Sequence, residues 1–219
     1  MYRLSASLLA ADFARIGDCI SQAEAAGADM IHIDVMDGAF VPPVSFGSPF
    51  IRSIRKCTRL PFDVHLMVDE PIRFVDDMKK CGADIVTVHY EACRHLDRTI
   101  NEIKECGMIA GVALNPTTPA DVLEYCAGNV GLILIMTVNP GYGGQKLIPD
   151  MLRKIRDVRK FCIEKDANPM IEVDGGVNFE NIPDLLGAGA DIVVAGTSVF
   201  SGNITDNVSR IKRIFSTLS

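Results

Sequence analysis

Positive charge is scarce in this chain of 219 residues: 22 Lys and Arg stand against 28 Asp and Glu, for a formal net charge of -6. Nucleic acids and anionic membranes are bound by basic surfaces, so we expect neither as a partner. The acidity does not exclude a small phosphorylated metabolite, because backbone amides can hold a phosphate without any lysine. A small phosphorylated metabolite therefore remains a candidate partner.

Long apolar segments and closely spaced cysteines are also missing. The longest apolar runs, such as residues 130–136 (VGLILIM), are too short to span a bilayer. The start of the chain, MYRLSASLLAADF, lacks the charged segment and long apolar core of a signal peptide. No CxxC metal or redox motif occurs among the seven cysteines. We therefore expect a soluble cytoplasmic protein with reduced, mostly buried cysteines.

No low-complexity stretch, charge block or linker divides the sequence, so we expect one domain over residues 1–219. A weak repeat is present instead: Gly-Ala-Asp followed by an apolar run begins at Gly27, Gly82 and Gly189. The intervals are close to two and four times a unit of about 27 residues, a common length for a strand plus a helix. Eight such units nearly fill the chain.

Short apolar runs bounded by Gly, Pro and Asp predict eight strands. They cover residues 4–8, 30–34, 62–66, 85–89, 109–114, 132–137, 170–174 and 192–195. Amphipathic patterns predict helices between them, for example over residues 12–26, 71–81, 97–106, 151–165 and 204–218. In the first of these, Asp12 stands at the N-cap position and Gly27 just beyond the C-terminal end.

Strands alternating with helices predict a parallel sheet that is covered on both faces. An open, doubly wound sheet is the alternative, but the GxGxxG motif after its first strand is missing. We therefore predict a single (β/α)8 TIM barrel. In such barrels the active site lies at the C-terminal ends of the strands, and phosphate is usually held after strands seven and eight.

Histidine and carboxylate side chains stand near the ends of three predicted strands. Because side chains alternate along a strand, His32 and Asp34 share the inner face, as do His65 and Asp174 on their own strands. This set suits one divalent cation, Zn²⁺, Mn²⁺, Fe²⁺ or Co²⁺. A lone inward histidine is more often an ordinary core residue. Four such groups in a dry barrel are costly without a cation.

The same carboxylates suggest proton transfer beside a carbonyl. If Asp34 and Asp174 lie on opposite sides of the substrate, one removes a proton and the other returns it to the opposite face, which inverts the carbon. A cation stabilises the enediolate between the two steps. Asp63 and Glu172, one step lower on the inner face, either orient the histidines or form ordinary buried hydrogen bonds.

Glycines cluster after the last three strands. The clusters contain Gly141, Gly143 and Gly144 around Tyr142, then Gly175 and Gly176, then Gly196 followed by Thr197. Glycines let backbone amides approach an anion closely, so three clusters at one end of a barrel predict a phosphate site. One cluster alone would be typical of a turn.

Other residues near the strand ends are weaker candidates. Met36, Met67 and Met136 are candidates for lining the pocket, although core packing is the usual role of methionine. Ser7 either binds a substrate hydroxyl or serves the structure. We expect His89, Glu91 and Asn115 beside the pocket without a catalytic role, and His95 at a solvated helix start.

The motifs SASLLAADF, HIDVMDGAFVP, DVHLMV, HYEA, LNPTTP, MTVNPGYGGQ, EVDGGVN and VAGTSVF lie between residues 5 and 200. In these motifs the sequence resembles the ribulose-phosphate 3-epimerase family. The resemblance implies a (β/α)8 barrel that interconverts D-ribulose 5-phosphate and D-xylulose 5-phosphate at C3 with one divalent metal. It implies His32, Asp34, His65 and Asp174 as ligands, Asp34 as proton acceptor, Asp174 as proton donor, and a homo-oligomer.

The resemblance also implies a set of substrate contacts. They are Ser7, His65, Gly141, Tyr142, Gly143, Gly144, Asp174, Gly175, Gly176, Gly196 and Thr197. The chain departs from the family at Pro43, where Asn is usual, and at Thr137 and Thr197, where Ser is usual. The two threonines also resemble the allulose-6-phosphate 3-epimerases, whose substrate is one carbon longer, so both substrates stay open.

Two other classes of function are less favoured. Lyases and decarboxylases with a similar phosphate site commonly use an inward lysine, and the predicted strand ends offer none. A non-catalytic, metabolite-binding barrel would have lost its ligand residues, and all four are present.

Overall fold

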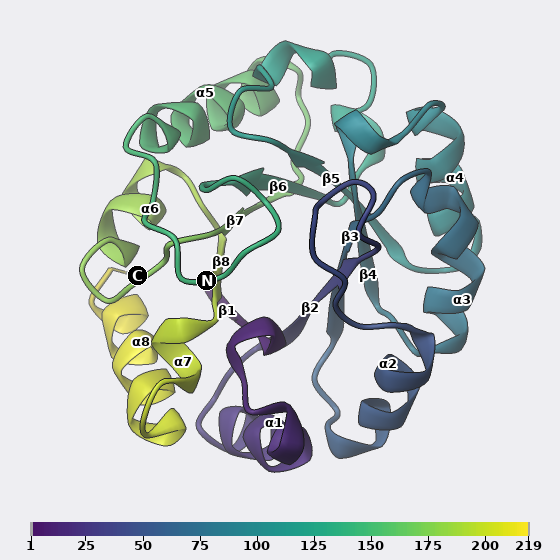
Figure 1. Cartoon of the computed structure of the whole chain (residues 1–219). Coiled ribbons are helices and arrows are strands. Elements are labelled where there is room, and N and C mark those ends of the chain that lie inside the picture. Colours follow the sequence, from purple (N-terminus) through teal and green to yellow (C-terminus); the bar gives the residue numbers. More distant parts are fainter. Residues whose placement is uncertain (1, 219) are drawn as a thin grey trace.

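Eight parallel strands close into a barrel in chain order in the computed structural model, which describes residues 2–218 (Figure 1). The strands are β1 (Arg3–Ser7), β2 (Met30–Met36), β3 (Phe62–Met67), β4 (Ile85–His89), β5 (Ile109–Leu114), β6 (Leu132–Met136), β7 (Met170–Asp174) and β8 (Ile192–Ala195). Their bounds agree with the predicted ones to within two residues. The largest difference is in β2, because its ladder with β3 continues to the pair Met36 and Met67. The (β/α)8 barrel is thereby confirmed.

Helices form a ring outside the strands (Figure 1). They are α1 (Ile16–Ala25), α2 (Ser48–Ile54), α3 (Val75–Lys80), α4 (Leu96–Glu105), α5 (Met151–Glu164), α6 (Ile182–Ala188), α7 (Thr197–Phe200) and α8 (Ile204–Leu218). Between β5 and β6, two short 3-10 turns, Ala120–Leu123 and Ala127–Asn129, take the place of an α-helix.

The predicted first helix is divided into a 3-10 turn, Phe13–Arg15, and α1. Asp12 caps the 3-10 turn by accepting a hydrogen bond from the Ala14 N–H at 3.0 Å. Arg15, with φ -128° and ψ 29°, does not have α-helical backbone angles, so the α-helix begins only at Ile16. Gly27 follows the end of α1 with φ 101°, the left-handed conformation that glycine allows there. The predicted helix over residues 71–81 divides in the same way, with a 3-10 turn over Pro71–Phe74 before α3.

The strands separate two apolar layers. The larger lies between the strands and the helices and includes Ile31, Ile33 and Val35 of β2. A smaller cluster, with Leu134 and Ile192, fills part of the barrel interior. The β2–β3 register sets His32 beside Asp63 and Asp34 beside His65, so the polar side chains of both strands occupy the inner face.

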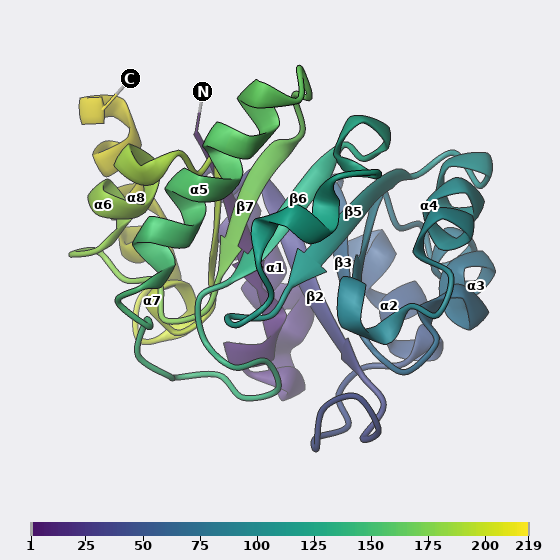
Figure 2. The ribbon, with the colours of Figure 1, turned by 90° about the horizontal axis from the view of Figure 1, so that it is seen from above.

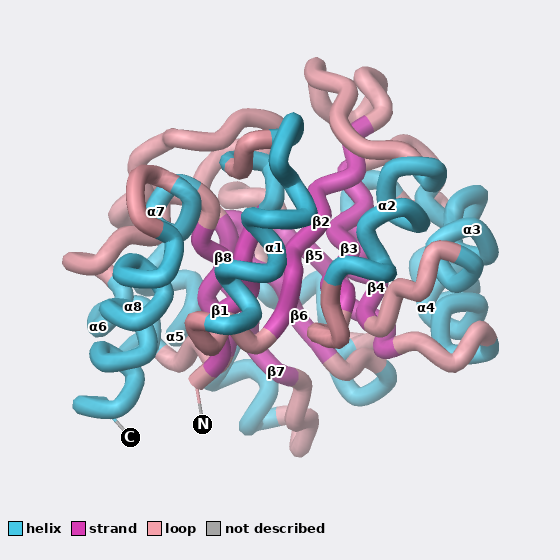
Figure 3. The backbone as a smooth tube through the Cα atoms, turned by 90° about the horizontal axis from the view of Figure 1, so that it is seen from below, coloured by secondary structure: helices cyan, strands magenta, loops and turns pink. Residues whose placement is uncertain are grey.

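Long loops follow the strands at one end of the barrel. The loops after β2 and after β6 extend on the same side, as Figures 2 and 3 show from opposite directions. This is the end where the β2, β3 and β7 strands finish, and it therefore carries the predicted site. None of the helices in residues 2–218 is long and apolar enough to cross a membrane.

Candidate active site

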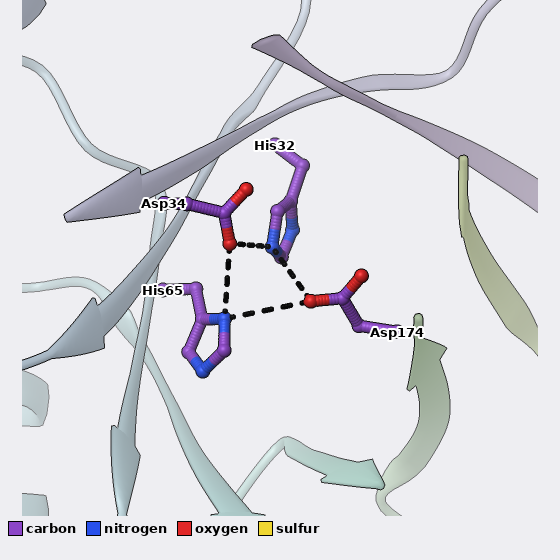
Figure 4. A group of neighbouring side chains, drawn as sticks. All are labelled: His32, Asp34, His65 and Asp174. Atoms are coloured by element: carbon purple, nitrogen blue, oxygen red, sulfur yellow. Dashed lines mark hydrogen bonds and ion pairs between the residues drawn. The ribbon is translucent and has the colours of Figure 1, made fainter. Parts of the chain in front are cut away.

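Four side chains from β2, β3 and β7 meet at the C-terminal end of the barrel (Figure 4). Asp34 Oδ1 lies 3.2 Å from His32 Nε2 and 3.3 Å from His65 Nδ1. Asp174 Oδ2 lies 3.8 Å from His32 Nε2 and 3.7 Å from His65 Nδ1. The two carboxylates and two imidazoles thus alternate around a ring, which we call the four-donor ring.

The four-donor ring fits a divalent cation. All four donor atoms lie within 4.8 Å of one another, and neighbouring donors are spaced by 3.2–3.8 Å. Donors about 2.1 Å from a tetrahedral metal are about 3.4 Å apart, so the spacing suits such an ion. His32 Nε2 is completely buried, has no hydrogen-bond partner within residues 2–218 and faces both carboxylates of the ring, so it can serve as a ligand atom once its proton leaves.

The two carboxylates of the ring have opposite proton affinities. Burial favours a neutral Asp34, but the charge of His32 outweighs it and holds the pKa of Asp34 well below its usual range. Burial and the charge of Asp34 raise the pKa of Asp174 to about 7. One carboxyl is therefore ionised while the other holds a proton near neutral pH, the pattern of a base facing an acid.

A second carboxylate pair lies deeper in the barrel. Asp63 Oδ2 lies 2.7 Å from His32 Nδ1 and accepts a hydrogen bond from Ser5 Oγ at 2.8 Å. His32 lowers the pKa of Asp63 against the effect of burial. Burial and then the charge of Asp63 raise the pKa of Glu172 well above its usual range. Of the two expected partners, Asp63 contacts His32 directly, whereas Glu172 lies within 4.8 Å of both His32 and Asp63.

His65 is connected to β4 through its second ring nitrogen. His65 Nε2 lies 2.9 Å from His89 Nε2, and His89 Nδ1 lies 3.1 Å from Glu91 Oε2. Burial lowers the pKa of His89 to about 4. From the sequence, His89 and Glu91 were expected only beside the pocket, without a catalytic role. Because side chains alternate along β4, His89 lies on the inner face with Thr87, and this alternation was the sequence signal that could have identified it.

A cavity of about 240 Å³ opens above the four-donor ring. Asp34 and Asp174 line it, and it extends to the loops after β6, β7 and β8. The other predicted residues on its wall are Ser7, Met36, Met67, Met136, Gly141, Tyr142, Gly143, Gly144, Gly175, Gly176, Gly196 and Thr197. His65 has no exposed surface and is not on this wall, so its expected contact with substrate stays a prediction.

Residues that were not predicted from the sequence also line the wall. Leu9, Val138 and Val194 are apolar, while Gln145 is polar. Gln145 Nε2 donates hydrogen bonds to the carbonyl oxygens of Asn139 and Tyr142, at 2.7 and 2.8 Å, which closes the loop after β6 on itself. Leu9, Val138 and Val194 lie within the motifs quoted above, but an apolar residue there looks like an ordinary core position, so its place on the wall was not predicted.

Two glycines hold the loops after β6 and β7 close together. Gly175 and Gly176 have φ of 115° and 67°, a region that side chains rarely adopt. A Cβ on Gly176 would lie 2.3 Å from the backbone nitrogen of Leu147. The Thr137 hydroxyl lies within hydrogen-bond distance of the carbonyl oxygens of Asp174 and Gly175. These contacts fix the position of Asp174 and of the glycine-rich wall.

The departures from the family pattern occupy different places. Thr137 is buried against backbone and is not on the cavity wall, whereas Thr197 is on it. Pro43 lies beside Gly141, because a Cβ on Gly141 would be 3.5 Å from Pro43 Cδ. Ser7 donates a hydrogen bond to Asp34 Oδ2 at 2.8 Å, so its hydroxyl already serves the site.

The family model and the curated relatives that match this chain carry the same enzyme name. Residues 3–200 match the ribulose-phosphate 3 epimerase family. The ribulose-phosphate 3-epimerase of Bacillus subtilis is 51% identical over 201 residues, covering 91% of this chain and 93% of that protein. The chloroplastic ribulose-5-phosphate-3-epimerase of Arabidopsis thaliana is 49% identical over 96% of this chain and 75% of its own length. The Escherichia coli K12 ribulose-phosphate 3-epimerase is 46% identical, covering 91% and 89%.

Solved structures with low identity share the fold. A tryptophan synthase α-subunit from Pyrococcus furiosus has a TM-score of 0.72 at 14% identity, covering 97% of both chains. Phosphoribosyl anthranilate isomerase from Thermus thermophilus has a TM-score of 0.69 at 11% identity, covering 99% of this chain and 100% of its own. At these identities the likeness shows the barrel alone.

Proposed function

The chain belongs to the ribulose-phosphate 3-epimerase family, and from that premise we propose that it interconverts D-ribulose 5-phosphate and D-xylulose 5-phosphate by transferring protons at C3 between Asp34 and Asp174. The observation that carries the proposal is the position of these two carboxyls. Both lie on the cavity wall and both belong to the four-donor ring, yet they come from β2 and β7.

The opposite proton affinities of the two carboxyls support their roles. Asp34, whose pKa is lowered, is the ionised base that takes the C3 proton. Asp174, with a pKa near 7, holds the proton that is returned to the other face. After transfer the protonation states are exchanged, so the pair is ready for the reverse reaction. The Ser7 hydrogen bond keeps Asp34 oriented through both steps.

His32, Asp34, His65 and Asp174 would hold one divalent cation, Zn²⁺, Mn²⁺, Fe²⁺ or Co²⁺. Bound there, it supplies positive charge that stabilises an enediolate. His32 contributes a second effect of its own: it lowers the pKa of Asp34 and keeps this carboxylate ionised, so that it can accept a proton.

The glycine-rich wall is the proposed phosphate site. Glycines of the loops after β6, β7 and β8 border one cavity, where backbone amides hold an anion without a lysine. The names of the relatives favour the five-carbon substrate over D-allulose 6-phosphate. Thr137, one of the residues that raised the six-carbon alternative, faces backbone rather than the cavity.

The direct test is an assay of both ketose phosphates with the metal-free protein and with each cation restored. We expect epimerisation of ribulose 5-phosphate at least tenfold more efficient in kcat/KM than that of allulose 6-phosphate, and its loss with a chelator. Higher efficiency on the six-carbon substrate would contradict the proposed substrate. Failure to act on either substrate with every cation would refute the epimerase assignment of this chain.

Hydrogen exchange at C3 separates the two carboxyls. Asp174→Asn keeps the base Asp34, so we expect loss of epimerisation but continued exchange of the ribulose 5-phosphate C3 proton with D₂O, followed by NMR. Asp34→Asn should exchange only xylulose 5-phosphate. Metal content is measured for each variant as the control, because both residues belong to the ring. Exchange of both epimers by either variant would contradict the two-carboxyl assignment.

A further inference from the structure

We propose that Glu91 and His89 are positioning residues that keep the proton of His65 on Nε2, so that His65 Nδ1 faces the four-donor ring with a free lone pair. The inference rests on the proposed function, because it concerns how the ring is prepared for its cation. We call the series Glu91, His89 and His65 the tautomer relay.

The relay is continuous in the structure. Glu91 Oε2 lies 3.1 Å from His89 Nδ1, and His89 Nε2 lies 2.9 Å from His65 Nε2. The His65 and His89 rings are stacked at an interplanar angle of 27°, with centroids 5.0 Å apart. Both histidines are fully buried, so water does not compete for these ring nitrogens. Each contact therefore needs one donor and one acceptor from the residues themselves.

The direction of every proton follows from Glu91. Its other oxygen, Oε1, accepts the backbone N–H of Asn115 at 2.8 Å and the hydroxyl of Thr118. These donors favour an ionised carboxylate, which accepts and does not donate. His89 must then carry its proton on Nδ1, which leaves Nε2 as an acceptor. His65 consequently donates from Nε2, and its Nδ1 is left unprotonated.

His32 has a simpler version of the same arrangement. Its Nδ1 lies 2.7 Å from Asp63 Oδ2, so a carboxylate fixes the orientation of this ring directly and Nε2 faces the ring. His65 has no carboxylate of its own on the far side, and Glu91 reaches it through His89. A histidine ligand usually requires such a partner on its second nitrogen, and losing it costs about 10–100-fold in metal affinity.

Substitution of Glu91 by glutamine tests the relay in a way that simple loss of contacts does not. If the glutamine Oε1 keeps its bonds to Asn115 and Thr118, the amide NH₂ faces His89 Nδ1. His89 then becomes an acceptor at Nδ1 and a donor at Nε2, which forces the proton of His65 onto Nδ1. To bind a metal through His65 Nδ1, this variant must pay one of two costs. Either the glutamine amide turns over, which leaves the Asn115 N–H without an acceptor, or the protons of His89 and His65 move to the opposite ring nitrogens against the contact with the amide NH₂. Glu91→Ala has no side-chain partner for His89 Nδ1, so it leaves His89 free to adopt either tautomer.

The experiment uses the full chain, stripped of metal and titrated with Co²⁺, whose visible absorption reports coordination. We expect Glu91→Gln to bind Co²⁺ about 10–100-fold more weakly than the wild type, and Glu91→Ala to lose less than about tenfold. Thr118→Val, which removes one donor to Glu91 and leaves the relay intact, is the matched control and should stay within about twofold of the wild type.

The order of affinities distinguishes the relay from a structural role. If Glu91 only supports the fold, alanine removes three contacts and glutamine fewer, so alanine would be the worse variant in both Co²⁺ affinity and metal-free thermal unfolding. Equal or stronger Co²⁺ binding by Glu91→Gln than by Glu91→Ala overturns the proposal. If the wild type itself does not bind Co²⁺, the proposed cation site fails and the relay fails with it.

A spectroscopic readout tests the proton positions without any metal. The chain has four histidines, which makes their ¹⁵N–¹H correlations assignable in the metal-free protein. We expect the Nε2–H tautomer for His65 in the wild type and the Nδ1–H tautomer in Glu91→Gln. Observation of the Nδ1–H tautomer in the wild type would refute the relay even if the cation site itself is confirmed.

Discussion

Asp63 and Glu172 are two buried carboxyls in contact range that we expect to respond in opposite ways to neutral substitution. Both are completely buried inside the barrel. Asp63 is held ionised by His32, while burial and Asp63 hold Glu172 in its protonated form. Asp63→Asn therefore removes a charge, whereas Glu172→Gln exchanges one neutral group for another of nearly the same shape.

The size of the first effect follows from the contacts of Asp63. Removing one partner of a buried ion pair costs about 3–5 kcal/mol, since the other charge is left without compensation. In Asp63→Asn that charge belongs to His32, which loses its 2.7 Å contact with Asp63 Oδ2 and keeps only the longer 3.2 Å contact with Asp34. For a protein of this length, each kcal/mol changes the Tm by about 2–4 °C. Asp63→Asn should lower the Tm by about 6–20 °C, and Glu172→Gln by less than about 4 °C.

The assay is thermal unfolding of the metal-free proteins at pH 7 with a chelator present, so that cation binding does not contribute. The double variant provides a further check. Without the charge of Asp63, Glu172 is able to ionise and partly replace it beside His32. The double amide variant lacks both carboxylates and should lose more stability than the sum of the single variants.

If Glu172→Gln lowers the Tm as much as Asp63→Asn, then Glu172 is ionised in the folded protein and the assignment of charges is wrong. A change below about 2 °C for Asp63→Asn would show that His32 carries no charge that needs compensation.

Two further predictions concern the cation and the glycine-rich wall. Burial lowers the pKa of His32, but Asp34 and Asp63 outweigh it and raise that pKa well above its usual value, so the His32 proton has to leave when a cation binds. Cation affinity measured by titration should therefore rise about tenfold per pH unit below pH 7, and a flat profile would contradict this. Gly176→Ala should lower the Tm by several degrees, because φ is 67° and the new Cβ would lie 2.3 Å from the Leu147 nitrogen. Gly143→Ala is the matched control on the same wall, with nothing within 4 Å of its Cβ, and should leave the Tm unchanged.

The ring residues were predictable because two simple rules apply to them. Side chains alternate along a strand, and parallel strands in a barrel finish at one end. Together these rules bring His32 and Asp34 on β2 to the same end as His65 on β3 and Asp174 on β7. The rules need only residue order and strand ends, both of which are visible in the sequence. The glycine-rich wall follows from the same reasoning.

The helical layer was less predictable for a local reason. The 3-10 turn over Phe13–Arg15 and the turns between β5 and β6 depend on how the chain meets the barrel, rather than on apolar spacing. Apolar residues such as Ile16 and Leu123 recur in these segments as they do in α-helices. The pattern therefore indicates which face is buried but not how tightly the backbone turns.

By itself, the sequence determined the barrel, the four donors and the glycine-rich loops, because each depends on periodicity and order along the chain. Tertiary structure alone decided which groups touch across strands and which carry charge. Thr137 turns to the backbone of Asp174, His89 lies within 2.9 Å of His65, and Asp63 and Glu172 differ in ionisation. These properties depend on distances between strands and on burial, which set hydrogen-bond partners and the cost of a charge.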